Sequence, residues 1–155
     1  MPHTCSTLIV HCMDFRFIRD IRAWMEGRGM LGDCDVVAVP GVAKVLVDPQ
    51  MLGDADFLLR AIGVAVNLHG AKRIILLNHL DCGAYGGARA FAAPQDERKR
   101  HERHLRRGAE IVRERFPHVA VAIALAELRP DGSVQFDEVA ARSEPQRAVP
   151  IGTAR

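Results

Sequence analysis

Short apolar runs alternate with segments of helical periodicity along this chain. Runs rich in Val, Ile and Leu predict buried strands, because such side chains pack well in a sheet. They lie at residues 7–12, 34–39, 72–77 and 119–125. Apolar residues at helical spacing predict helices between the strands. These helices lie at residues 18–25, 54–69 and 96–116, and the last of them is densely charged.

Strands and helices that alternate in this way favour a parallel sheet with helices on both faces. The sequence therefore predicts the α/β class, with a mostly parallel four-stranded sheet flanked by helices. Asp131 and Gly132 signal a tight turn, and residues 134–137 after it are a candidate antiparallel edge strand. Ligands of such sheets gather at the carboxyl ends of strands. This chain carries Cys12 and the glycine-rich loop of residues 78–87 at two such ends.

Composition and net charge limit the class of protein and its partners, but they do not identify a reaction. The chain has 155 residues, of which 48% are hydrophobic and 26% charged, as expected for a globular domain. We expect a single domain over residues 1–142 and an irregular tail over residues 143–155, which contain Pro145 and Pro150. A formal net charge of +2 is too small to favour nucleic acid or an anionic membrane as a partner.

The first residues of the chain and the lengths of its apolar runs bear on the cellular location of the protein. The first residues show no export signal, and no apolar stretch approaches the roughly 20 residues of a membrane-spanning helix. We therefore expect a cytoplasmic protein. In that compartment the four cysteines favour thiols, metal ligands or nucleophiles over disulfides. Cys5 and Cys34 lie outside any motif, and we interpret them as plain core or surface thiols.

Three soft or borderline metal ligands follow strands that could be neighbours in the sheet. His79 and Cys82 are separated by two residues, and Cys12 ends the first predicted strand. Two cysteines and one histidine are a known ligand set of catalytic zinc, which leaves the fourth tetrahedral position open. The alternative for each cysteine alone is a small buried side chain without metal.

A second pattern starts at the same cysteine. Asp14 and Arg16 follow Cys12 at alternate positions, so an extended backbone would put both on one side. An aspartate paired with arginine stays ionised and can accept a hydrogen bond from water at a metal. An ordinary surface ion pair is the other interpretation.

Together these patterns resemble the β-class carbonic anhydrases, which carry Cys-x-Asp-x-Arg after the first strand and His-x-x-Cys after a later one. The resemblance implies that Cys12, His79 and Cys82 bind zinc and that Asp14 and Arg16 form a catalytic dyad. It implies reversible hydration of carbon dioxide to bicarbonate by zinc-bound hydroxide. It also implies a homodimer or a higher homo-oligomer. In some members the aspartate itself binds zinc until the arginine withdraws it.

The resemblance leaves other functions open. Relatives with the same ligands hydrolyse carbonyl sulfide or carbon disulfide, and a non-catalytic zinc-binding relative is a further alternative. Residues 39–44 differ from the Arg-Asn-Ala-Gly stretch that the family usually carries after the second strand. Phe15 replaces a residue that is more often small, so its ring is expected to fill or line the pocket. Asn78 stands where glycine commonly precedes the histidine.

Two competing classes fit the sequence less well. A phosphatase-like cysteine nucleophile at Cys12 needs an arginine after a five-residue loop, and Ile18 stands there. Nucleic-acid binding would rest on the arginines of residues 96–116. Acidic residues interleave with these arginines, and no aromatic side chains are placed among them for base stacking, so an exposed face with many ion pairs is favoured.

Overall fold

The computed structural model describes residues 3–141, which form one five-stranded sheet and its covering helices. The strands are β1 (Thr7–His11), β2 (Cys34–Ala38), β3 (Arg73–His79), β4 (Ala120–Leu128) and β5 (Val134–Val139). The α-helices are α1 (Ile18–Gly27), α2 (Ala43–Val47), α3 (Asp54–Asn67) and α4 (Pro94–Arg115). Single 3₁₀ turns are η1 (Phe15–Phe17), η2 (Gly83–Tyr85) and η3 (Ala88–Ala90).

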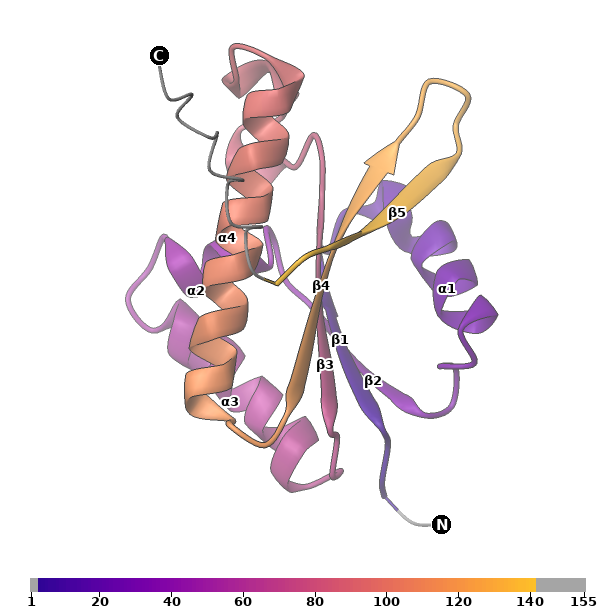
Figure 1. The fold of residues 1–155 in the computed structure, drawn as a ribbon, viewed down its shortest axis with the longest axis vertical. Helices are drawn as coiled ribbons and strands as arrows, with labels where there is room; N and C mark the ends of the chain where they lie inside the picture. The colour runs from indigo at the N-terminus through magenta and orange to yellow at the C-terminus, as the bar shows by residue number, and fades with distance from the viewer. Residues whose placement is uncertain (1–2, 142–155) are drawn as a thin grey trace, which may run out of the picture.

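The strand order β2-β1-β3-β4-β5 confirms the predicted α/β class. The first four strands are parallel, and β5 pairs antiparallel with β4 at the edge. Helix α1 covers one face of the sheet, and α2, α3 and α4 cover the other (Figure 1). Because β1 lies directly beside β3, with His11 opposite Leu77, the chain segments that leave these two strands emerge side by side.

The hydrophobic core has one layer on each face of the sheet. Leu8, Val10, Ile74 and Leu76 belong to the layer under α2, α3 and α4. Ile9, Ile75 and Leu77 alternate with them and pack against α1. Successive residues of a strand point to opposite faces, so a strand covered on both sides is apolar at almost every position. This explains why β1 and the first part of β3 read as continuous apolar runs.

Differences from the predicted elements concentrate near the carboxyl ends of the strands. Strand β3 continues to His79, so the expectation that the loop starts at Asn78 is wrong by two residues. The short helix α2 was not predicted, and α4 begins at Pro94, where a proline fits the first helical turn. The expected tail at residues 143–155 lies outside the described residues.

No helix within residues 3–141 has the length and apolar character needed to cross a membrane. Charged side chains of the long helix α4 form ion pairs with one another. Arg106 contacts Glu102 at 3.3 Å, and Arg107 contacts Glu110 at 3.0 Å. Such pairs are what interleaved charges at helical spacing predict.

Candidate metal centre

Three metal-ligating side chains meet where β1 and β3 end. Cys12 directly follows β1, His79 is the last residue of β3, and Cys82 lies three residues further on. The Sγ atoms of the two cysteines are 4.0 Å apart. One ligand atom from each of the three residues lies within 4.8 Å of the others, and all three side chains are buried. The structure thus brings together the three residues that the sequence indicated.

The orientation of His79 leaves one ring nitrogen free. Its Nδ1 lies 2.8 Å from the carbonyl oxygen of Leu80 and must donate to it, since a carbonyl only accepts. The proton is therefore on Nδ1, and Nε2 carries a lone pair. Within the described residues Nε2 is buried and has no hydrogen-bond partner. A buried, unpartnered nitrogen beside two thiols fits a metal ligand, whose second nitrogen is typically fixed by a hydrogen bond of this kind.

The two thiols influence each other's ionisation. A hydrogen bond from Cys82 lowers the pKa of the Cys12 thiol, although burial opposes this effect. The same hydrogen bond, together with burial, raises the pKa of Cys82. The pair therefore favours one thiolate with the remaining proton held between the sulfurs. Thiolate is the form of cysteine that binds metals.

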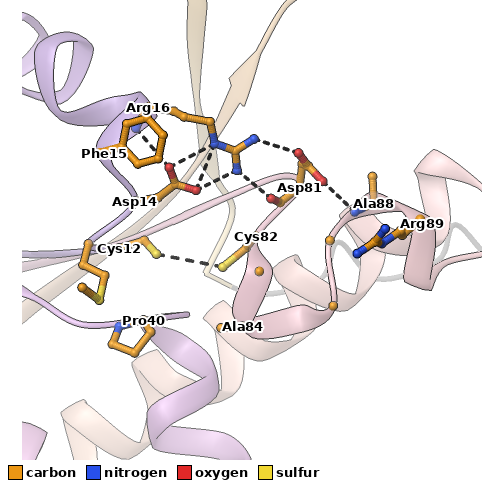
Figure 2. A pocket seen from close by; sticks show the side chains of 14 residues that line it. Cys12, Asp14, Phe15, Arg16, Pro40, Asp81, Cys82, Ala84, Ala88 and Arg89 are labelled. Atoms are coloured by element: carbon orange, nitrogen blue, oxygen red, sulfur yellow. Dashed lines mark hydrogen bonds and ion pairs between the residues drawn. The ribbon is translucent and has the colours of Figure 1, made fainter.

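Asp14 and Arg16 form a tight ion pair beside this cluster (Figure 2). Arg16 Nη2 donates to Asp14 Oδ2 at 2.7 Å, and Nε donates to Oδ1 at 3.0 Å. The Arg16 backbone N–H also donates to Oδ1 at 3.0 Å, which caps η1. Hydrogen bonding from Arg16 lowers the pKa of Asp14. Asp14 Oδ2 lies 3.7 Å from His79 Nε2, so an ionised carboxylate faces the candidate metal position.

A second aspartate shares the Arg16 side chain. Arg16 Nη1 donates to Asp81 Oδ2 at 2.8 Å, and Nη2 donates to the Asp81 carbonyl oxygen at 2.9 Å (Figure 2). Asp81 Oδ1 accepts from the backbone N–H of Ala88 at 2.9 Å. This bond and the one from Arg16 lower the pKa of Asp81. Sequence reasoning missed this residue, although it lies between the two ligands His79 and Cys82.

Helix α4 stabilises the backbone turn at Asp81. Asp81 has a φ of +55°, which is uncommon for residues other than glycine, although aspartate and asparagine adopt it more readily than most. Its backbone N–H donates to the buried carboxylate of Glu97 at 2.6 Å. His101 Nε2, one helical turn away, lies 3.7 Å from Glu97 Oε1. Burial lowers the pKa of His101 to about 3, so this ring stays neutral.

Asn78 joins the end of β3 to three other segments. Its Oδ1 accepts from the Ala43 N–H at 3.1 Å, and its Nδ2 donates to Tyr85 Oη at 3.1 Å and His101 Nδ1 at 3.0 Å. Tyr85 Oη is in turn 3.0 Å from His104 Nδ1. The amide therefore fixes α2, η2 and α4 around the carboxyl end of β3, which explains a buried polar residue immediately before His79.

Gly41 lies within the segment that departs from the family pattern. Its φ is +78°, and a Cβ atom there would stand 2.8 Å from the Cβ of Ala84. Ala84 belongs to η2, which follows Cys82 directly. Glycine at position 41 therefore allows the segment after β2 to pack against the loop that carries Cys82.

An open pocket of about 1000 Å³ leads to the two thiols. It is lined by both cysteines, the Asp14–Arg16 pair, Asp81 and apolar groups that include Pro40 and Ala84 (Figure 2). Phe15 lines the pocket but is 85% exposed. The ring therefore borders the pocket and does not fill it. This resolves the expectation drawn from the sequence in favour of a lining role.

Comparisons with known proteins agree with the fold and the motifs. A family model described as "Putative carbonic anhydrase" matches residues 1–127. An uncharacterized protein of Rickettsia bellii is 32% identical over 133 residues, covering 84% of this chain and 80% of that protein. The uncharacterized protein RC0076 of Rickettsia conorii is 30% identical over 133 residues, covering 84% of this chain and 70% of that protein.

Two solved structures resemble the fold at low sequence identity. The β-carbonic anhydrase CafA of Aspergillus fumigatus has a TM-score of 0.60 and 16% identity, with 91% of this chain and 77% of that chain covered. One of two tetrameric β-carbonic anhydrases of Sordaria macrospora has a TM-score of 0.52 and 16% identity, with coverage of 88% and 83%. These likenesses concern the architecture of the sheet and its helices.

Proposed function

Because the chain belongs to the carbonic anhydrase family that the matching model describes, we propose that it is a zinc-dependent lyase that reversibly hydrates carbon dioxide to bicarbonate. One observation carries this proposal: the buried, unpartnered Nε2 of His79 lies in a cluster with two thiols that favour a thiolate. A polar nitrogen without a partner in a protein interior is costly. A metal ion that accepts its lone pair removes that cost.

Cys12, His79 and Cys82 would hold the zinc, each through one atom. Three protein ligands leave a fourth position, which is the arrangement of catalytic rather than structural zinc sites. Zinc bound in this way supplies a Lewis acid that makes water a competent nucleophile near neutral pH. The Leu80 carbonyl fixes the tautomer of His79, so the ring presents its lone pair without reorganisation.

The Asp14–Arg16 pair would orient the attacking water. Asp14 is ionised because Arg16 lowers its pKa, so its Oδ2 can only accept a hydrogen bond. An acceptor at this position would hold a proton of water at Asp14 and would leave an oxygen lone pair available to the carbon of the substrate. Arg16 is held by Asp14 and Asp81 together, which limits rotation of the carboxylate.

The pocket suits a small-molecule substrate with little polarity. Pro40, Ala84 and Phe15 contribute apolar surface near the thiols, and carbon dioxide has no net dipole. Carbonyl sulfide and carbon disulfide share the linear shape of carbon dioxide. They are therefore the natural comparison substrates in any assay.

The oligomeric state, the cellular location and the domain limits of this chain stay predictions. The Sordaria macrospora proteins are described as tetrameric, which supports the expected homodimer or higher homo-oligomer. The exposed side chains of Met13 and Phe15 at the pocket rim would supply apolar surface to a second copy. We keep the cytoplasmic location and a single domain over residues 1–142 as proposals from the sequence.

Stopped-flow hydration of carbon dioxide tests the function. Protein with verified zinc should catalyse hydration, with activity that rises from about pH 6.5 to 9 as expected for water at a metal. Removal of zinc with a chelator should abolish turnover, and added zinc should restore it. Zinc-loaded protein that fails to hydrate carbon dioxide at every pH would contradict the proposal. Parallel assays with carbonyl sulfide and carbon disulfide would then separate a hydrolase from a non-catalytic zinc protein.

Asp81→Asn should lower kcat/KM for hydration about fivefold without loss of zinc. Asparagine tolerates a positive φ and can still accept from the Ala88 N–H, so the change removes chiefly the charge that anchors Arg16. Asp81 is largely exposed, so the pair is worth only about 1 kcal/mol. Steady-state hydration kinetics and metal analysis measure the effect, with Asp56→Asn on the exposed start of α3 as control. Full activity in Asp81→Asn would show that Arg16 needs no second anchor.

A further inference from the structure

A second group of metal-ligating side chains lies at the opposite end of the sheet. Cys5 precedes β1, Asp35 lies in β2 and His69 follows α3. One ligand atom from each lies within 4.8 Å of the others, and all three residues are half-buried. The cluster is at the amino ends of the strands, the end from which β1 starts (Figure 1). It therefore shares no residue with the centre at Cys12.

Backbone hydrogen bonds hold two of these three segments together. The Cys5 N–H donates to the His69 carbonyl at 3.0 Å, which joins the start of β1 to the segment after α3. The Lys72 N–H donates to the Ser6 carbonyl at 3.0 Å, just before β3 begins. The positions of Cys5 and His69 are thus fixed by the main chain and do not depend on a ligand.

The sheet register brings Asp35 to the same place. Asp35 pairs with Leu8 across β1 and β2, and paired residues point to the same face of a sheet. Leu8 packs in the layer under α3, and Cys5 packs against that layer too. Asp35 Oδ2 lies 2.6 Å from His69 Nδ1. All three side chains therefore meet on one face, beside the end of α3.

We propose that Cys5, Asp35 and His69 form a second metal site, which takes a borderline transition-metal ion of the zinc and cobalt class. Thiolate, imidazole and carboxylate are all ligands of such ions, whereas calcium and magnesium prefer oxygen alone. Three ligands on a half-buried surface leave coordination positions for water. Within the described residues the Cys5 thiol donates to the Thr7 carbonyl at 3.4 Å. A thiol is a weak hydrogen-bond donor, so binding a metal breaks no strong interaction of the sulfur.

Cys34 provides a matched control for the cysteine of this site. It neighbours Asp35 in β2, but it packs against the layer on the α1 face of the sheet. Its Sγ donates to the Asp35 carbonyl at 3.2 Å. Cys34 is half-buried like Cys5 and is absent from the ligand group. A serine at position 34 therefore removes a nearby thiol and leaves the proposed ligands in place.

Cobalt(II) titration of metal-free protein tests the second site. The double variant Cys12→Ser/Cys82→Ser removes the thiols of the first centre, so that the second is observed alone. This variant should bind one cobalt per chain and show a near-ultraviolet thiolate-to-cobalt absorption band. Adding Cys5→Ser should abolish the band. Adding His69→Asn should raise the dissociation constant at least about tenfold, and adding Cys34→Ser should change neither band nor affinity.

The wild-type chain gives an independent measurement if the double variant does not fold, as judged by circular dichroism. Wild type should then bind two cobalt ions per chain, and Cys5→Ser alone should bind one. A folded double variant without a thiolate band, or a wild-type stoichiometry of one that Cys5→Ser leaves unchanged, would overturn the proposal. So would a band that Cys34→Ser removes. Carbon dioxide hydration is measured separately, so a first centre that binds metal without catalysing hydration leaves these readouts intact.

Discussion

Cys82→Ser should release one equivalent of zinc per chain and lower carbon dioxide hydration by roughly a thousandfold or more. A serine hydroxyl keeps its proton near neutral pH, so two of the three ligands remain and the centre loses its anionic balance. A catalytic metal contributes several kcal/mol of charge stabilisation, and about 4 kcal/mol corresponds to roughly a thousandfold in rate. Inductively coupled plasma mass spectrometry and stopped-flow hydration measure the two effects.

The control for this variant is Cys34→Ser. Cys34 is a half-buried thiol of β2 that lines neither the pocket nor the candidate centre, so both zinc content and rate should match the wild type. Circular dichroism separates loss of the site from loss of the fold, since serine is nearly the same size as cysteine. A folded Cys82→Ser protein that keeps its zinc and its activity would show that the ligand set is wrong.

The convergence of Cys12, His79 and Cys82 could be anticipated because the physics of parallel sheets is simple. Carboxyl ends of parallel strands lie at one edge, and both motifs start where an apolar run stops. The sequence did not reveal the strand order, and two strands of one sheet need not be neighbours. The structure places β1 beside β3, and the three side chains meet for that reason.

Helix α2 could not be predicted from the local sequence. It spans only Ala43–Val47, and the preceding Val42 has a φ of +42°, which is unfavourable for a β-branched residue. The segment is held instead by Asn78, which accepts from the Ala43 N–H. A helix stabilised by a side chain 35 residues away has no periodic signal of its own.

Asp81 and the second cluster were missed for a related reason. Asp81 reaches Arg16 because its backbone adopts a φ of +55° supported by Glu97, a contact between residues 16 positions apart. Cys5, Asp35 and His69 are spaced by about 30 residues or more and match no short metal motif. Such constellations depend on the register of β1 with β2 and on the end of α3, which only the folded chain defines.

Asp14→Asn should lower carbon dioxide hydration about a hundredfold while the zinc content stays unchanged. The amide has the same shape but carries no charge, and it can present an N–H where the carboxylate only accepts. Removing a positioned acceptor of this kind typically costs about a hundredfold or more. Stopped-flow rates and metal analysis measure the outcome, with Asp56→Asn as the charge-matched control on α3.

The pH profile of Asp14→Asn distinguishes an orienting role from a titrating one. Hydrogen bonds from Arg16 hold the pKa of Asp14 below its ordinary value, so the carboxylate keeps its charge throughout the neutral range. It would gain a proton only below the ordinary pKa of an aspartate. Asp14→Asn should therefore scale the whole rate profile down and leave its midpoint in place. Loss of zinc in this variant would show instead that Asp14 holds the metal, and wild-type rates would show that it orients nothing.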